Sequence, residues 1–232
     1  MIGILRQKTP ANILLLLIFG VLIKLPIFLQ PHVPVTTEKD GILFQAIIEF
    51  LSPLSRSLPI AFPFIAFLLL FTQAISLTRI MNDQRLMSRS NYLPGMAYLL
   101  VTSFFSEWNY FSAPLLINTA LIFILNSLFR IYNHPRAKGI IFNIGLVIGV
   151  CSFIFFPSVT FIIWVLFGLI IMRPFRLNEW LLCIVGVTVP YYFYASYLFL
   201  TDQMILSKIT PYVFLKVPVI EQSIWIAGST LL

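Results

Sequence analysis

The chain contains 232 residues, of which 59% are hydrophobic and 10% charged, and it carries a formal net charge of +7. A soluble domain has about 25% charged residues, so this composition excludes an ordinary soluble domain and indicates a multi-pass membrane protein. The apolar runs lack the alternation of outer-membrane strands, which predicts an all-α fold, a polytopic bundle of transmembrane helices. The basic residues are spread over short connecting segments, so they indicate membrane topology rather than a nucleic-acid partner.

The first predicted span covers residues 11–29. Arg6 and Lys8 precede it, and the apolar run continues without a small-residue cleavage site, which favours a span over a cleaved signal peptide. Lys24 lies near the far end of this span. We expect its long side chain to reach the headgroup layer there.

Residues 30–54 predict an outside loop, rich in proline and polar residues, followed by a short helix. In that helix apolar residues recur at helical spacing opposite a polar face, which is typical of a helix lying in the membrane interface. The segment is too short to span a bilayer. Its apolar positions are Phe44, Ile47, Ile48 and Leu51.

Six further apolar segments predict spans, because each approaches the roughly 20 residues that cross a bilayer. They are residues 58–80, 92–105, 113–129, 140–156, 158–172 and 181–200. Residues 201–218 are predicted to form an outside segment, and residues 219–232 the start of an eighth span. The sequence therefore predicts a single integral membrane domain, residues 1–232, of seven to eight spans.

The basic residues are distributed unevenly between the two sides of this predicted topology. The segments placed inside carry 10 of the 15 Lys and Arg residues, and the reverse orientation would place 5 inside. Cytoplasmic loops carry such an excess. We therefore expect a bacterial inner-membrane protein with a cytoplasmic N-terminus. The inside residues are Arg6, Lys8, Arg79, Arg85, Arg89, Arg130, Arg136, Lys138, Arg173 and Arg176.

Residues 172–180, MRPFRLNEW, form a charged island between two apolar runs. Arg173 and Arg176 are placed where basic side chains anchor to lipid phosphates. Glu179 falls near the start of the following helix, where a carboxylate is favoured by the unsatisfied backbone N–H groups. The island therefore predicts an interfacial anchor rather than a catalytic site.

Small residues recur in the predicted span 140–156. Gly145 and Gly149 form a Gly-x-x-x-Gly face, which predicts close packing between helices of the bundle, with a dimer interface as the alternative. Cys151 and Cys183 both lie within apolar runs. We interpret them as small buried side chains.

Three amides lie within predicted spans, at Asn118, Asn126 and Asn143. We expect hydrogen bonds between helices at these positions, and a substrate path is the alternative. No Asp, Glu, Lys or Arg falls in the middle of a predicted span, so the pattern does not favour ion-coupled transport.

Three segments carry a resemblance to a known family, SNYLPGMAYLL, IIFNIGLVIGVCSFIFFPS and MRPFRLNEWLL…VTVPYYF. They resemble a multi-pass inner-membrane family of Bacteroidetes, a domain of unknown function with an Arg-Pro-Phe…Glu-Trp element. The resemblance covers residues 71–202, and because members of that family are longer it implies a further C-terminal part. A carotenoid-oxygenase label sometimes given to the family needs several His ligands for iron. This chain has His32 and His134, on opposite predicted sides, so that label is set aside.

The order of span, outside acidic loop, interfacial helix and span is similar to the start of the GT-C glycosyltransferases. The resemblance implies a GT-C-like core that binds a polyprenyl-phosphate-linked substrate at the outer face. By this resemblance Asp40 and Glu107 are the candidate catalytic residues and the candidate ligands of magnesium or manganese. The candidate substrate-binding residues are Glu38, Arg56 and Lys208.

Two hypotheses about function follow. The first is a lipid-linked substrate-binding protein of envelope biogenesis, with glycosyl transfer as the activity that the resemblance implies. The second is a non-catalytic membrane subunit that holds partner membrane subunits in an envelope assembly or secretion complex. A cavity between the first outside loop and the second predicted outside turn, residues 106–112, would favour the first hypothesis. A flat outer surface with an exposed apolar stripe would favour the second.

Overall fold

The computed structural model describes residues 10–29, 31, 32, 34, 36, 40–58, 60–132, 137–172 and 176–202. Within these residues the chain is helical, and its only extended pairing is an isolated bridge between Asp40 and Phe155. The all-α prediction is therefore confirmed for the described part of the chain. The predicted eighth span, residues 219–232, lies outside the described residues.

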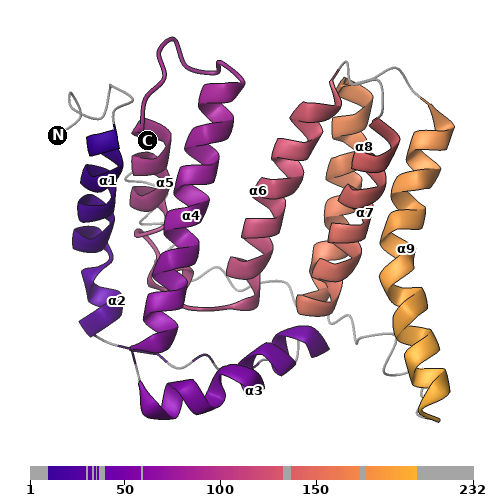
Figure 1. The fold of residues 1–232 in the computed structure, drawn as a ribbon, viewed down its shortest axis with the longest axis horizontal. Coiled ribbons are helices and arrows are strands. Elements are labelled where there is room, and N and C mark those ends of the chain that lie inside the picture. Colours follow the sequence, from indigo (N-terminus) through magenta and orange to yellow (C-terminus); the bar gives the residue numbers. More distant parts are fainter. Residues whose placement is uncertain are drawn as a thin grey trace, which may run out of the picture.

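Most helices run alongside one another, and α3 lies across one end of them (Figure 1). In chain order the elements are α1 (Pro10–Ile23), α2 (Leu25–Leu29), α3 (Ile42–Ser57), α4 (Ala61–Asp83), α5 (Leu93–Val101), the 3-10 helix η1 (Ser106–Asn109), α6 (Ala113–Ile131), α7 (Ala137–Ile154), the 3-10 helix η2 (Phe156–Thr160), α8 (Phe161–Met172) and α9 (Leu177–Leu200).

Four helices among the described residues, α4, α6, α7 and α9, are long and apolar enough to cross a membrane. They correspond to four of the predicted spans. The other three predicted spans are shorter or broken. The first divides at Lys24 into α1 and α2, the third is helical only over the nine residues of α5, and the sixth comprises η2 and the 12 residues of α8. A count of seven spans therefore stays a prediction.

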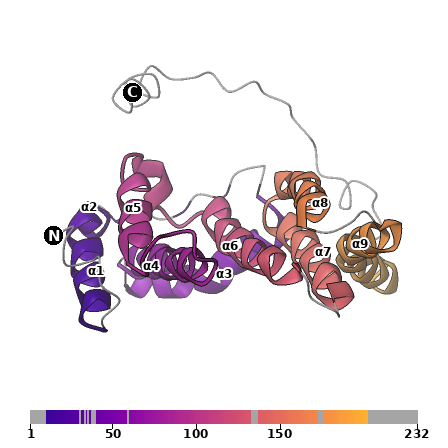
Figure 2. The same cartoon turned by 90° about the horizontal axis from the view of Figure 1, so that it is seen from above.

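Seen along the helix axes, α1, α4, α6, α7 and α9 form a curved row, and α5 and α8 lie on the same side of it (Figure 2). The α4–α5, α6–α7 and α8–α9 connections all lie at one end, which we call the basic end (Figure 1). Elements α3, η1 and η2 lie at the opposite end. The predicted inside segments that the structure describes therefore share one end. The basic end includes Arg85, Arg89, Arg130, Lys138 and Arg176.

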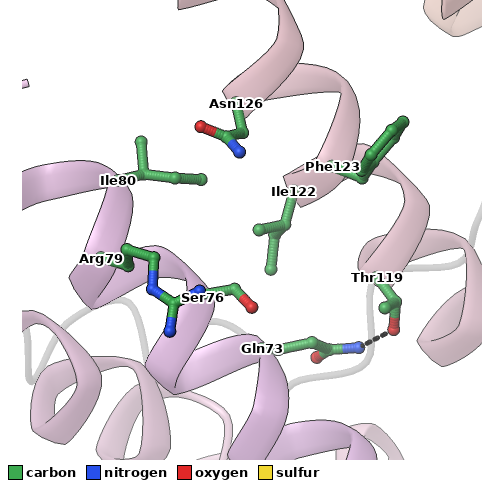
Figure 3. A pocket seen from close by; sticks show the side chains of 8 residues that line it. All are labelled: Gln73, Ser76, Arg79, Ile80, Thr119, Ile122, Phe123 and Asn126. Atoms are coloured by element: carbon green, nitrogen blue, oxygen red, sulfur yellow. Dashed lines mark hydrogen bonds between the residues drawn. The ribbon is translucent and has the colours of Figure 1, made fainter. Parts of the chain in front are cut away.

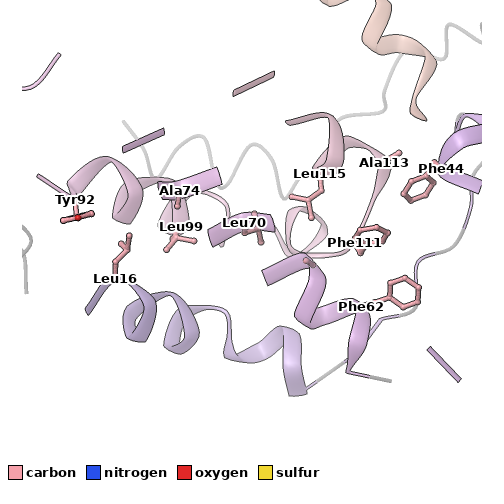
Figure 4. Packing of buried hydrophobic residues seen from close by; sticks show 11 residues of the cluster. Leu16, Phe44, Phe62, Leu70, Ala74, Tyr92, Leu99, Phe111, Ala113 and Leu115 are labelled. Atoms are coloured by element: carbon pink, nitrogen blue, oxygen red, sulfur yellow. The ribbon is translucent and has the colours of Figure 1, made fainter. Parts of the chain in front are cut away.

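The apolar core is divided into two clusters. The first contains buried residues from α1, α3, α4, α5 and the start of α6, including Leu16, Leu70 and Leu99 (Figure 4). The second contains buried residues from the end of α6, α7, α8 and α9, including Ile144 and Val165. Because α6 contributes Leu115 to the first cluster and Leu128 to the second, this helix joins two half-bundles.

Helix α3 confirms the predicted short amphipathic helix, with a different environment for its apolar face. Phe44 is 1% exposed and stacks on Phe111, at a centroid distance of 5.9 Å, within the first core cluster. Ile47, Ile48 and Leu51 pack against the same cluster. Burial of these side chains removes apolar surface from water, so this apolar face of α3 covers the end of the bundle. The predicted place of the helix in the membrane interface stays a prediction.

Helices α7 and α9 approach closely because glycines face each other. A Cβ placed on Gly145 would lie 2.1 Å from the carbonyl oxygen of Cys183, and one on Gly186 would lie 2.5 Å from that of Phe142. Such distances leave no room for any side chain. The predicted packing role of the Gly-x-x-x-Gly face is confirmed, and Cys183, which is free and buried as expected, lies in the same contact.

Candidate functional site

A cleft lies between α4 and α6, in the half of the bundle nearer the basic end. Its volume is about 250 Å³. Gln73, Ser76, Arg79 and Ile80 line it from α4, and Thr119, Ile122, Phe123 and Asn126 line it from α6 (Figure 3). The cleft therefore presents one cation, two amides and two hydroxyl groups between helices that are otherwise apolar.

Hydrogen bonds between three helices form the floor of the cleft. The Nε2 of Gln73 donates to the Oγ1 of Thr119 at 2.6 Å and to the carbonyl oxygen of Leu115 at 2.9 Å. The hydroxyl of Tyr98, on α5, donates to Gln73 Oε1. Asn118 Nδ2 donates to that hydroxyl at 2.7 Å. Gln73 is 1% exposed, and a buried amide is stable in an apolar bundle only when it is bonded in this way.

Lys24 occupies the break between α1 and α2, and its side chain is 1% exposed. Its Nζ donates to the Oγ1 of Thr102 at 2.9 Å and to the Oδ1 of Asn109. Thr102 follows α5, and Asn109 ends η1. The two residues that accept these bonds are buried, with Thr102 7% and Asn109 8% exposed. They hold the amine inside the protein, so the prediction that Lys24 reaches the headgroup layer is wrong.

The first loop and the second turn that the sequence predicts to lie outside meet at the end opposite the basic end. The ring of His32 stacks on the ring of Tyr110, with centroids 4.4 Å apart and an interplanar angle of 16°. Tyr110 directly follows η1. The two segments that the GT-C resemblance pairs are thus in contact, through these aromatic rings.

Asp40 lies at the other end of the first loop, against the end of α7. It forms the isolated bridge with Phe155, and the N–H of Gly41 donates to the carbonyl oxygen of Ile154 at 2.8 Å. A Cβ on residue 41 would lie 2.0 Å from the carbonyl oxygen of Phe153. Glycine at this position therefore allows the loop to lie directly on the end of α7 and fixes where α3 begins.

Glu107 lies in η1, with an exposed side chain. Asp40 is thus held by a contact with the end of α7, whereas Glu107 belongs to the turn that follows α5. Their proposed sharing of magnesium or manganese stays a prediction. Across the described residues, no group of three or more His, Cys, Asp or Glu side chains could hold a metal ion. Glu38 and Lys208 lie outside the described residues, as does the side chain of Arg56.

The three amides that the sequence places within predicted spans have different environments. Asn118 forms the predicted hydrogen bonds between helices, whereas Asn126 lines the cleft and Asn143 is exposed on α7. Sequence reasoning did not single out Gln73 or Tyr98. The available signal was the position of Gln73, 12 residues into a 23-residue apolar helix. An amide there is costly to bury without hydrogen-bond partners.

The predicted position of Glu179 near the start of a helix is confirmed, because the residue lies in the first turn of α9, where it is buried. Arg176 is exposed immediately before this helix, and Arg173 lies outside the described residues. The anchoring role of the island stays a prediction.

Over the described residues the chain is all-helical, with four membrane-length apolar helices and a polar cleft between two of them, an arrangement compatible with a membrane protein. No family model, curated protein or solved structure matches the chain.

Proposed function

We propose that this chain is a multi-pass inner-membrane protein that binds the phosphate headgroup of a lipid-linked substrate, of the polyprenyl-phosphate class, in the cleft between α4 and α6. The observation that carries the proposal is the position of Arg79 beside Gln73, Ser76, Thr119 and Asn126 in one cavity. Arginine and neutral hydrogen-bond donors are the groups that recognise phosphate oxygens.

The size of the cleft supports a headgroup as its occupant. Pockets for drug-sized ligands measure roughly 300–1,000 Å³, and this one measures about 250 Å³. It can hold a headgroup while the hydrocarbon chain stays in the bilayer. Phe123, on the rim, is 54% exposed, which provides an apolar edge for such a chain. The site lies nearer the basic end than the end where the sequence predicted it.

Glycosyl transfer in envelope biogenesis, with a GT-C-like core and Asp40 and Glu107 as catalytic residues, is the second candidate function. The stacking of His32 on Tyr110 favours it, because this contact brings the first outside loop onto the second outside turn. A scaffold subunit remains the non-catalytic alternative. The apolar surface of α9, which exposes Tyr192, Phe193 and Phe199, suits either lipid or a partner helix.

Binding to the purified protein in detergent tests the first proposal. The probe is a fluorescent polyprenyl phosphate, compared with the same polyprenol lacking phosphate. We expect the phosphate form to bind more tightly, and Arg79→Gln to weaken its binding about tenfold. Hydrogen bonds to charged groups contribute roughly 1.5–3 kcal/mol, and 1.4 kcal/mol is a factor of ten.

Arg176→Gln is the matched control, since Arg176 is exposed at the basic end and does not line the cleft. Its binding should equal that of the unmodified chain. Equal binding of polyprenol and polyprenyl phosphate would overturn the phosphate site. If glycerol phosphate binds as tightly as the lipid form, the site is one for a soluble phosphate ester, and the lipid assignment is wrong.

A further inference from the structure

Polar side chains continue from the cleft toward the opposite end of the bundle. Tyr98, bonded to Gln73 at the floor of the cleft, lies one helical turn before Thr102. The Oγ1 of Thr102 donates to the carbonyl oxygen of Tyr98 at 2.9 Å and accepts a hydrogen bond from Lys24 Nζ. Lys24 in turn bonds Asn109, in η1. The polar series from the cleft to η1 therefore consists of two groups one turn apart on α5. Gln73, Tyr98 and Asn118 lie between α4, α5 and α6, and Thr102, Lys24 and Asn109 lie between α5, the α1–α2 break and η1.

The charges in this series are arranged in a specific way. One cation, Arg79, lies in the cleft, and a second, Lys24, lies beside η1. Neutral amides and hydroxyl groups occupy the interval between them, at Gln73, Tyr98 and Asn118. Buried polar side chains are costly within a membrane and mark substrate paths there. Cations at both ends with neutral groups between them suit an anion that bears several oxygen atoms.

The division of the core shows how such a path could open. The hydrogen bonds from Gln73 to Thr119 and from Asn118 to Tyr98 close the path below the cleft, and they join α6 to α4 and α5. Helix α6 also packs in the second core cluster. Movement of α6 away from α4 and α5 would break these bonds and open the path, and it would also separate Leu115 from the first core cluster. Relative movement of packed helices exposes one site to both sides in many transporters.

We propose that the chain moves the anionic phosphate headgroup of a lipid across the membrane along this series, from Arg79 to Lys24. The inference rests on the proposed binding of a lipid phosphate in the cleft. The headgroup exchanges hydrogen bonds with Gln73, Tyr98 and Thr102 in turn, and the hydrocarbon chain stays in the bilayer. No covalent bond forms or breaks.

Reconstituted vesicles provide the test. The protein is placed in phosphatidylcholine vesicles that contain a trace of phosphatidylglycerol with a nitrobenzoxadiazole group on its acyl chain. Dithionite, which does not cross the bilayer, destroys the outer-leaflet fluorescence. We expect about half of the fluorescence to remain in empty vesicles and markedly less with the protein. An encapsulated soluble fluorophore reports any leakage of dithionite.

Lys24→Met alters the far part of the path, and Tyr98→Phe alters the floor of the cleft, where the path begins. Lys24→Met and Tyr98→Phe should each slow movement of the lipid at least tenfold. Asn143→Leu removes an exposed amide of α7 that is outside the path and should leave the rate unchanged. Thermal unfolding in detergent identifies any variant that fails to fold. Because Tyr98→Phe removes one hydroxyl and keeps the ring, it tests the path even if Lys24→Met unfolds.

The outcomes separate this inference from the proposed function. A protein that binds polyprenyl phosphate but leaves half of the vesicle fluorescence protected would overturn the inference and leave the binding site standing. Full movement of lipid by folded Tyr98→Phe and Lys24→Met would also overturn it. Uptake of radiolabelled inorganic phosphate into the same vesicles, without movement of the lipid, would show that the path carries free phosphate and that the lipid assignment is wrong.

Discussion

The amine of Lys24 donates a hydrogen bond to the Oγ1 of Thr102 at 2.9 Å, across 78 residues of sequence. This bond, with that from the same amine to Asn109, ties the break between α1 and α2 to the turn after α5. Helix α1 also packs against α5 through Leu16 and Leu99 in the first core cluster. The amine is thus the polar part of a contact that is otherwise apolar.

Lys24→Met should lower the stability of the protein, because it leaves the buried acceptors of Thr102 and Asn109 with one fewer partner. A buried polar group left without its partner costs about 1–3 kcal/mol, and each kcal/mol corresponds to roughly 2–4 °C in Tm for a chain of this size. Thermal unfolding in detergent measures the change. Lys138→Met, at an exposed position of α7, is the control, and an equal Tm for both variants would contradict the structural role of Lys24.

Gly145→Ala should destabilise the contact between α7 and α9, because the added Cβ would lie 2.1 Å from the carbonyl oxygen of Cys183. Overpacking of this kind costs about 1–3 kcal/mol. Gly139→Ala, in the same helix, is a matched control because nothing lies within 4 Å of its Cβ position. That control should gain about 0.5–1 kcal/mol, since alanine is a better helix former than glycine. Thermal unfolding of both variants in the same detergent measures the difference in stability. The prediction fails if Gly145→Ala is as stable as Gly139→Ala.

The predicted orientation places the basic end in the cytoplasm. Ser90→Cys, in the α4–α5 connection, should then be protected from an impermeant thiol reagent in intact cells, and Gln45→Cys, on α3, should react. Both positions are exposed, and the natural Cys151 and Cys183 are buried, so they give little background. Both variants should react after permeabilisation. Labelling of Ser90→Cys alone in intact cells would reverse the orientation.

Asp40→Asn should abolish transfer of a sugar from a polyprenyl-phosphate donor if Asp40 acts as the catalytic base, since an amide cannot accept the proton of the acceptor hydroxyl. Membrane insertion should be unchanged, because the backbone contacts of residues 40 and 41 with the end of α7 do not need the carboxylate. Incorporation of labelled sugar into membrane lipid measures the activity. Glu49→Gln, on the exposed face of α3, is the control, and a fully active Asp40→Asn protein would end the transferase hypothesis.

The sequence by itself determined the class of fold, which of the described connections share one end of the bundle, and the packing role of Gly145. Apolar periodicity and charge bias are local properties, and each helix carries them regardless of its neighbours. The same reasoning correctly identified α3 as a short amphipathic helix. It could not distinguish a face that packs on protein from one that lies in lipid, because both are equally apolar.

Only the tertiary structure decided where Lys24 points and that Gln73, Tyr98 and Asn118 meet. Lys24 and Thr102 are 78 residues apart, and Gln73 and Asn118 are 45 residues apart. A lysine near a helix end has the same local sequence whether it reaches lipid headgroups or a buried acceptor. The difference lies in which helices become neighbours. That depends on the fit of whole helix surfaces, such as Leu16 against Leu99 and Gly145 against Cys183. A local pattern of residues does not contain this information.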